Sequence, residues 1–168
     1  MPDPGDVLKA GKFKSPSLKA RALRLLSLRE YSRKDLGSKL SEYATQIDAA
    51  EGNNALTIES ILDDFEQRGW LSDTRFAEAL VRRRSERYGM RKIQGELDRA
   101  GVSSEHSADL LEQLKLSEFA RAKELWERKF DIIATDPKER ARQYRFLVSK
   151  GFNADLVARI ISGKPNKQ

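Results

Sequence analysis

A dense group of basic side chains lies near the centre of the sequence. It comprises Arg82, Arg83, Arg84, Arg87, Arg91 and Lys92, which fall within eleven consecutive residues. Guanidinium and ammonium groups donate charge-assisted hydrogen bonds to carboxylates and phosphates. The group therefore indicates a binding site for an acidic protein surface or for nucleic acid. A solvated helix face without any ligand is the simpler alternative.

The spacing of charges distinguishes the members of this group. Arg82 lies one helical turn from Glu78 and from Glu86, and either carboxylate can neutralise it. Arg83 and Arg87 instead face each other one turn apart, where like charges cost roughly 0.2–0.5 kcal/mol. A bound anion would relieve this repulsion, which favours the binding interpretation.

The sequence offers little for catalysis. It contains no cysteine, and its only histidine, His106, falls in the first turn of an expected helix, where we expect it to be exposed. Asp63 and Asp64 would point about 100° apart on a helix, and beyond Glu59 no third ligand for a magnesium ion is evident. No glycine-rich phosphate loop or nucleophile motif occurs. We expect no catalytic residue, no metal and no cofactor, hence no enzyme.

Composition limits the class of protein and its location. Of the 168 residues, 39% are hydrophobic and 35% are charged, which is too apolar for a wholly disordered chain. The lack of cysteine excludes disulfides and fits a reducing compartment. No run approaches the ~20 apolar residues of a membrane span, and residues 1–17 lack the apolar stretch of a signal peptide. We expect a cytoplasmic protein with no membrane partner.

The net charge of +6 is unevenly distributed. Residues 71–100 carry eight basic and five acidic side chains, whereas residues 101–114 carry three acids and no lysine or arginine. Residues 115–168 carry thirteen basic and seven acidic side chains. This balance permits binding to nucleic acid or to an acidic protein. The aromatic residues fall at helix ends or on apolar stripes, which favours core packing over a stacking platform for single strands.

Apolar residues recur at helical spacing through most of the chain, and no comparable stretch alternates with a period of two. The stripes are Leu36, Leu40, Tyr43 and Ile47, then Ile58, Ile61, Leu62 and Phe65, and then Phe119, Ala122, Trp126, Phe130 and Ile133. The sequence therefore predicts an all-α fold.

Two junctions share one pattern, in which a glycine ends a helix, an apolar residue turns inward and a polar residue caps the next helix. They are Gly101-Val102-Ser103 and Gly151-Phe152-Asn153, and Gly69-Trp70-Leu71-Ser72 is a looser version. Asp136 followed by Pro137 predicts another helix start.

Sequence similarity between segments about fifty residues apart indicates an internal repeat. YSRKDLGSKL at 31–40 aligns with YGMRKIQGEL at 88–97, and the segment at 143–161 aligns with that at 95–114. We predict three tandem three-helix units at 18–69, 72–114 and 117–163, flanked by a disordered basic arm at 1–17 and a tail at 164–168. Stacked units of this kind form an elongated, curved rod.

Three segments resemble the RecX family. They are ALRLLSLREYSRKDLGSKL at 22–40, GWLSDTRFAEALVRRRSERYGMRKIQGELDRAGV at 69–102, and FLVSKGFNADLVARII at 146–161. The resemblance extends from about Leu18 to Gly163. The loop at 48–55 departs from the family pattern, and the arm at 1–17 carries no family motif.

The resemblance implies three three-helix repeats and a bacterial modulator of the RecA recombinase. RecX proteins bind the RecA–DNA filament, in its groove or at its growing end. They inhibit filament extension, ATP hydrolysis, strand exchange and SOS co-protease activity, and so act in DNA repair and homologous recombination. Weak binding to single- or double-stranded DNA is also attributed to the family. We expect the RecA filament as the partner of a monomeric protein.

The resemblance bears unequally on the basic residues. Family members carry basic residues at positions matching Arg75, Arg84 and Arg91, whereas Arg82, Arg83 and Arg87 are assigned from local charge alone. We hypothesise that the partner-binding set is Arg75, Arg82, Arg83, Arg84, Arg87, Arg91 and Lys92. The alternative is a DNA-binding protein that competes with RecA for single-stranded DNA.

Overall fold

The computed structural model describes residues 16–47 and 54–165, and all regular elements in these ranges are helices. They are α1 (Leu18–Leu28), α2 (Arg33–Ile47), α3 (Asn54–Gln67), α4 (Asp73–Arg84), α5 (Met90–Arg99), α6 (Ser104–Phe130), α7 (Pro137–Ser149) and α8 (Ala154–Ile161). The all-α prediction is confirmed for these residues. None of these helices combines the length and apolar character that crossing a bilayer requires.

Parts of the expected arm, loop and tail, namely residues 1–15, 48–53 and 166–168, lie outside the described residues. Ser17, which was assigned to the arm, is instead the cap of α1, and its Oγ accepts a hydrogen bond from the backbone N–H of Ala20 at 3.2 Å.

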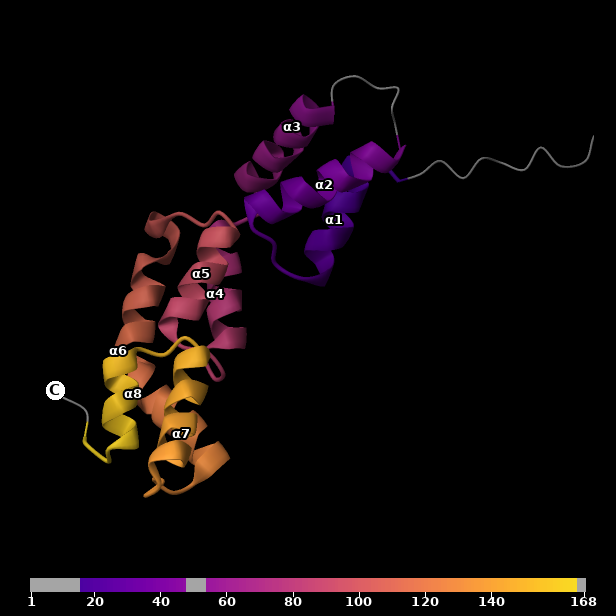
Figure 1. Ribbon diagram of the computed structural model, residues 1–168. Coiled ribbons are helices and arrows are strands. Elements are labelled where there is room, and N and C mark those ends of the chain that lie inside the picture. Colours follow the sequence, from indigo (N-terminus) through magenta and orange to yellow (C-terminus); the bar gives the residue numbers. More distant parts are fainter. Residues whose placement is uncertain (1–15, 48–53, 166–168) are drawn as a thin grey trace, which may run out of the picture.

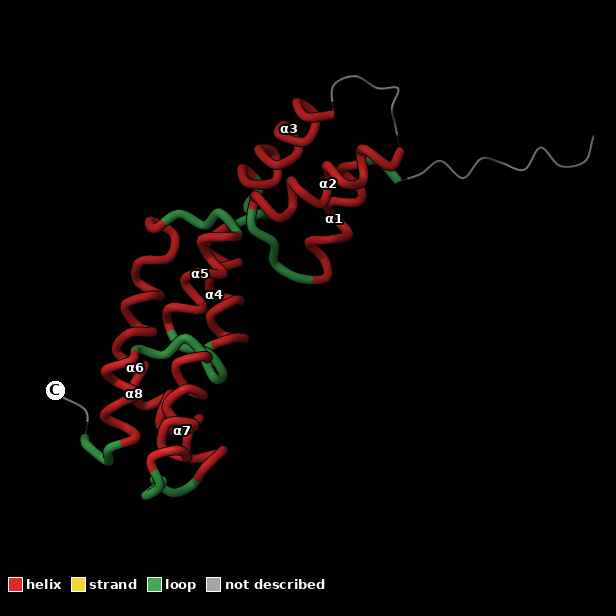
Figure 2. The backbone as a smooth tube through the Cα atoms, viewed as in Figure 1, coloured by secondary structure: helices red, strands yellow, loops and turns green. Residues whose placement is uncertain are grey.

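The molecule is an elongated, bent rod, as predicted (Figure 1). Helices α4 to α8 extend along one direction, and α1 to α3 form a separate bundle set at an angle to them. The chain crosses this bend between the end of α3 and the start of α4, and Figure 2 shows the short loop that makes the connection.

The buried side chains form three hydrophobic clusters along the rod. The first includes Leu36, Leu40, Leu62 and Phe65, the second Phe76, Leu80, Ile93 and Leu97, and the third Trp126, Leu147, Phe152 and Val157. These clusters support the division into units at 18–69, 72–114 and 117–163, which stays a prediction.

The glycine junctions have the predicted geometry. Gly101 and Gly151 adopt φ values of 73° and 90°, a region that side chains disfavour. The backbone N–H of Val102 donates to the carbonyl of Leu97 at 3.1 Å, which closes the end of α5. Val102 and Phe152 are both buried.

The junction at Gly69 differs because the chain buries the second residue after the glycine. The N–H groups of Trp70 and Leu71 both donate to the carbonyl of Phe65, at 2.8 Å and 3.1 Å. Leu71 is 2% exposed and joins the first cluster, whereas Trp70 is 44% exposed. Ser72 then caps α4 as expected, since its side chain accepts from the backbone N–H of Arg75.

The predicted boundary between the second and third units contains no break in the helix. Helix α6 runs uninterrupted for 27 residues and contributes to both the second and the third cluster. Residues 114–118 contain leucine, lysine, serine and glutamate but no glycine or proline, so nothing in them stops a helix. The described residues therefore form eight helices, because α6 is shared by the second and third clusters.

Two glycine backbones meet where the second and third clusters adjoin. The N–H of Gly89 donates to the carbonyl of Lys150 at 2.9 Å. A Cβ atom at Gly89 would lie 2.3 Å from backbone atoms of Gly151 and Phe152, and one at Gly151 would lie 2.6 Å from the Cβ of Lys92. The two bundles can approach this closely only because both positions lack a side chain.

Helix α6 reinforces this contact through Arg121. Its Nη1 donates to the carbonyls of Ser85 and Tyr88, both at 2.8 Å, and its Nη2 donates to the carbonyl of Leu114 at 2.9 Å. Burial lowers the pKa of Arg121, and the charge of Glu118 opposes that effect. The guanidinium thus fixes the turn between α4 and α5 against α6.

Glu118 holds the other side of the same turn. Its carboxylate is buried and accepts a hydrogen bond from the backbone N–H of Met90, the first residue of α5, at 3.0 Å. A carboxylate at this position also suits the partial positive charge of a helix N-terminus.

The bend at the start of α4 is held differently. The most extensive packing between helices occurs within α1–α3 or within α4–α8. Polar contacts connect the two parts, namely Arg75 Nε to Glu30 Oε1 at 3.1 Å, Arg33 N to Asp73 Oδ1 at 2.8 Å, and Lys34 Nζ to Arg99 O at 2.8 Å.

We expect Gly89→Ala to lower the free energy of unfolding by about 1–3 kcal/mol, because the added methyl group would collide with rigid backbone. Urea denaturation followed by circular dichroism measures this. The control is Gly95→Ala within α5, where the nearest atom is the flexible tip of Arg99 at 3.8 Å. It should stabilise by roughly 0.5–1 kcal/mol. Equal stability of Gly89→Ala and the parent protein would contradict the close contact.

Arg121→Met should destabilise the protein by at least about 2 kcal/mol, because three carbonyls lose a charged donor. The matched control is Arg128→Met, also on α6, whose Nη2 donates only to the carbonyl of Glu86 at 3.1 Å from an exposed position. Its effect should stay within about 0.5 kcal/mol. Hydrogen exchange at the Met90 amide should accelerate only in Arg121→Met, and unchanged protection there would refute this role.

Candidate functional site

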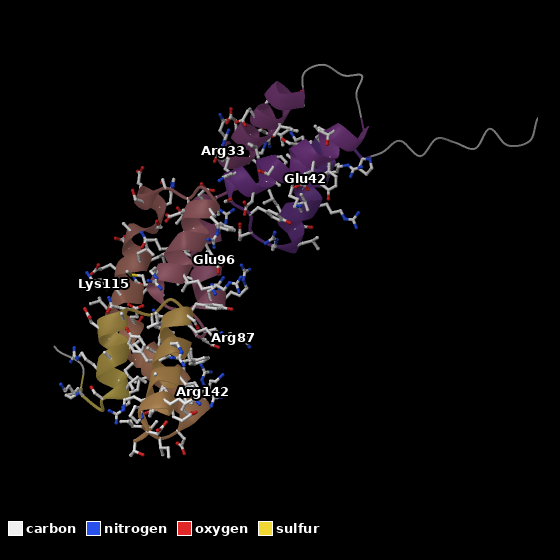
Figure 3. The ribbon with its side chains drawn as sticks, viewed as in Figure 1. Arg33, Glu42, Arg87, Glu96, Lys115 and Arg142 are labelled. Carbon is white, nitrogen blue, oxygen red and sulfur yellow. The ribbon has the colours of Figure 1, made fainter. Side chains whose placement is uncertain are left out.

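The basic group surrounds the corner where α4 ends and α5 begins. Arg82, Arg83 and Arg84 form the last turn of α4, and Arg91 and Lys92 lie in the first turn of α5. Figure 3 shows Arg87, in the intervening turn, projecting from one side of the rod. Hereafter these six residues are called the arginine corner.

The two helix ends treat positive charge differently. Cations at the C-terminus of α4 interact favourably with the helix dipole, whereas cations in the first turn of α5 oppose it. Helix α5 has no acidic residue in that turn to offset Arg91 and Lys92. Helix stability therefore does not account for the basic residues at the start of α5.

Four guanidinium groups of the arginine corner are exposed and have no ion pair or side-chain hydrogen bond to any described residue: Arg82, Arg83, Arg87 and Arg91. The expected neutralisation of Arg82 by Glu78 or Glu86 is therefore wrong. An exposed ion pair gains little and must restrict two long side chains, so solvation prevails. These four groups remain available to an external anion.

The other members have partners within the protein. Arg84 Nε pairs with Glu96 Oε2 of α5 at 3.0 Å, and its guanidinium lies 5.3 Å from the centre of the Tyr88 ring. Lys92 Nζ lies 4.5 Å from the same ring. Both side chains thus pack on Tyr88, which is half-buried.

Arg75 lies at the opposite end of α4 from the arginine corner. Its Nε pairs with Glu30 and its Nη2 donates to the carbonyl of Trp70 at 3.0 Å. These contacts cross the bend, so the structure gives Arg75 a role in connecting the two parts. Its role in binding a partner stays a prediction, as do those of the arginine corner.

The third cluster adds cations that the sequence analysis did not include. Lys150 Nζ lies 5.4 Å from the Tyr88 ring centre and 5.6 Å from that of Phe146. Lys129 Nζ lies 4.2 Å from the Phe146 ring centre. These residues are far from the corner in sequence, and the Gly89–Gly151 contact brings Lys150 beside Tyr88. Local charge patterns contain no signal for such a contact.

Three of the carboxylates on α3 are bound by one arginine. Arg33 Nη2 pairs with Glu59 at 2.6 Å and Asp63 at 2.7 Å, and Nη1 pairs with Glu66. Burial acts to lower the pKa of Arg33, but hydrogen bonds to these carboxylates and the charge of Glu66 raise it overall. Within the described residues, no acidic or histidine cluster has the composition of a metal site.

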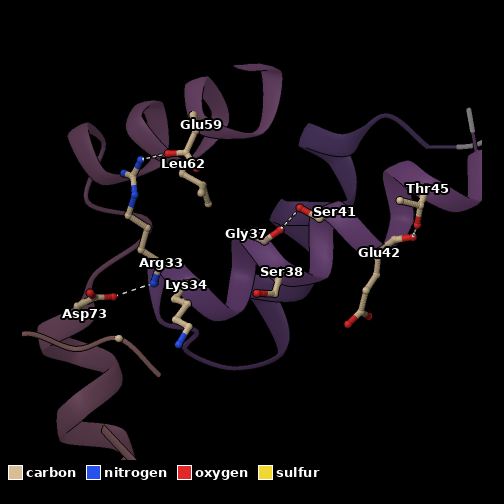
Figure 4. Close-up of a pocket in the computed structure, with 11 residues that line it drawn as sticks. Arg33, Lys34, Gly37, Ser38, Ser41, Glu42, Thr45, Glu59, Leu62 and Asp73 are labelled. Atoms are coloured by element: carbon tan, nitrogen blue, oxygen red, sulfur yellow. Dashed lines mark hydrogen bonds and ion pairs between the residues drawn. The ribbon is translucent and has the colours of Figure 1, made fainter. Parts of the chain in front are cut away.

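An open groove of about 860 Å³ lies beside this network, between α2, α3 and the start of α4 (Figure 4). Figure 4 shows Arg33 using its backbone N–H for Asp73 and its guanidinium for Glu59. Ser41 and Thr45, also on the groove wall, donate to carbonyls of their own helix. These two hydroxyl groups are thus engaged by the backbone of α2.

The chain is similar to known proteins along most of its length. Residues 72–111 match the family described as "RecX, second three-helix domain" and residues 117–161 match "RecX, third three-helix domain". It is 44% identical to the regulatory protein RecX of Ralstonia nicotianae, covering 88% of this chain and 87% of that protein. It is 43% identical to RecX of Leptothrix cholodnii, covering 86% of this chain and 87% of that protein.

The fold agrees with solved structures. The crystal structure of RecX from Lactobacillus salivarius superposes with a TM-score of 0.67 at 20% identity, covering 87% of this chain and 93% of that one. A second crystal structure, of a regulatory protein RecX, superposes with a TM-score of 0.68 at 22% identity. The match covers 86% of this chain and 71% of that one. Together with the identity to the curated relatives, these matches show that the chain belongs to the RecX family of regulatory proteins.

Proposed function

We propose that this protein is a negative modulator of RecA. It binds the RecA–DNA filament, in the groove or at the growing end, and inhibits filament extension together with ATP hydrolysis, strand exchange and SOS co-protease activity. It does so as a monomeric cytoplasmic protein without chemistry of its own. Family membership supports the assignment to RecA regulation.

One observation supports the arginine corner as the contact surface. Four exposed guanidinium groups there lack any partner among the described residues, and Arg121 and Glu118 fix the turn that connects α4 to α5. An acidic surface on RecA would supply carboxylates to these groups and relieve their mutual repulsion. Because the turn is already ordered, little backbone freedom is lost on binding.

A second candidate is competition with RecA for single-stranded DNA. The observation in its favour is the surface formed by Tyr88 and Phe146 with Lys92, Lys129 and Lys150. Half-buried rings flanked by ammonium groups suit a strand whose phosphates meet the cations.

Charge reversal at Arg87→Glu with Arg91→Glu should leave the fold intact and weaken inhibition of the DNA-dependent ATPase of RecA. Removing two charge-assisted contacts should raise the half-inhibitory concentration by on the order of 100-fold. The control is Arg24→Glu with Lys115→Glu, which makes the same charge change at exposed positions. Lys115 projects from the side of the rod away from Arg87 (Figure 3). Full inhibition by the folded Arg87/Arg91 variant would refute the assignment.

Salt dependence separates the two candidates. Direct binding to single-stranded DNA that neutralises six phosphates should weaken about 300-fold between 50 and 200 mM salt. Fluorescence anisotropy with labelled oligonucleotide, with and without RecA, measures this. Binding that requires RecA and changes much less with salt agrees with the protein contact. A steep slope without RecA, at concentrations that inhibit the ATPase, would favour competition for DNA.

A further inference from the structure

A small notch of about 260 Å³ lies where the α1–α3 bundle meets the α4–α8 part of the rod. Three arginines line it: Arg29 directly follows α1, Arg83 belongs to the last turn of α4, and Arg99 is the last residue of α5. The notch thus draws guanidinium groups from both sides of the bend. An anion held there would contact both parts of the molecule at once.

These arginines outnumber the carboxylates that line the notch. None of the three has an ion pair with a described residue. The notch is also lined by Asp35 and Glu96, but Glu96 is already engaged by Arg84 at 3.0 Å. The notch therefore holds an excess of positive charge.

Arg29 has a cation–π contact within the first bundle. Its guanidinium lies 4.1 Å from the centre of the Tyr31 ring, and Tyr31 is buried in the first cluster. Stacking on an aromatic ring uses the face of a guanidinium and leaves its N–H groups free to donate in the plane. The N–H groups of Arg29 therefore remain available to an acceptor in the notch.

The shape and charge of the notch favour a carboxylate over a nucleic-acid strand. Its volume suits one or two side chains, and its inner wall includes the buried residues Phe76 and Leu80. A nucleic-acid strand carries a charge at every nucleotide, and a notch of this volume would enclose only a small part of such a strand. A single carboxylate can instead accept paired hydrogen bonds from the guanidinium groups. We propose that the notch binds an aspartate or glutamate side chain of a protein partner and thereby fixes the α1–α3 bundle relative to α4–α8.

The bend is suited to such control. Polar contacts, not extensive helix packing, connect its two sides, so its angle depends on a small number of charged groups. Without an anion, Arg29 repels Arg83 and Arg99 across the bend, and a carboxylate converts this repulsion into attraction to a shared ion. A ligand that prefers one angle shifts the population towards it. The inference rests on the proposed function for one point only, namely that the partner is a protein.

The test measures the angle directly. The chain has no cysteine, so spin labels can be placed at Ser60→Cys in α3 and Gln113→Cys in α6, both exposed positions. Double electron–electron resonance then gives the distribution of distances across the bend. We expect hexaglutamate to narrow this distribution in the full-length protein at low salt.

Variants identify the notch as the cause. Arg29→Ala and Arg99→Ala should each raise the Kd for hexaglutamate by about tenfold and abolish the narrowing. Arg145→Ala is the matched control, because Arg145 is an exposed arginine on α7 without an ion pair to a described residue. Its Kd should stay within about twofold of the parent protein. Arg99→Ala keeps the test valid if Arg29→Ala loses the Tyr31 contact and unfolds.

Three results would overturn the inference: no narrowing with hexaglutamate, equal narrowing in the Arg99→Ala variant, or notch-dependent narrowing by oligo(dT) alone. RecA inhibition separates it from the proposed function. If Arg29→Ala and Arg99→Ala inhibit RecA fully while the Arg87/Arg91 reversal does not, the notch has no role in the inhibition of RecA. The proposed function then stands. If the parent protein does not inhibit RecA while hexaglutamate still narrows the distribution in a notch-dependent way, the notch stands and the proposed function fails.

Discussion

The contact between the backbones of Gly89 and Gly151 determines how the two C-terminal bundles fit together. No side chain can occupy the space between them, so the turn before α5 lies directly on the turn before α8. Arg121 and Glu118 then bind the polar groups that this arrangement would otherwise bury unpaired. The α4–α5 turn and the third cluster consequently form one continuous body, from which the arginine corner projects at a fixed position.

The arginines are of two kinds, which differ in whether a carboxylate of the protein pairs with them. Arg33, Arg75 and Arg84 are held by carboxylates and contribute to the structure. Arg82, Arg87 and Arg91 project into solvent with no such partner among the described residues. Repulsion among the exposed group costs little stability when water and salt screen it, yet it favours any ligand that brings negative charge. Unpaired positive charge, which opposes the dipole at the start of α5, therefore also suits this surface for binding an anion.

The sequence predicted what depends on local interactions. Helical spacing identified the apolar faces, and the glycine at position 101 identified both the end of α5 and the inward turn of Val102. The repeat did not reveal that α6 continues through residues 114–118, because an alignment of similar segments does not show whether the chain between them stays helical. The pairing of Arg82 was wrong because spacing allows an exposed ion pair without making it favourable.

Local sequence patterns did not predict which residues distant in the sequence lie close together in the fold. Arg29 and Arg99 approach Arg83 only after three helices have packed, and Lys150 reaches Tyr88 only through the glycine contact. The ion pair of Arg75 with Glu30 likewise joins residues that are 45 positions apart in the sequence. Long-range pairs of this kind depend on how bundles are oriented, which no period in the sequence encodes.

The uninterrupted path of α6 through two clusters has a consequence for how such proteins can change. A helix advances about 100° and 1.5 Å for each residue, so inserting one residue between Leu114 and Glu118 would swing the terminal bundle a quarter-turn or more around the common axis. Loops elsewhere tolerate changes in length. In this part of α6, however, the number of residues determines how the third bundle is rotated relative to the second. A substitution in this segment should therefore disturb the contact between the two bundles far less than an insertion or deletion there.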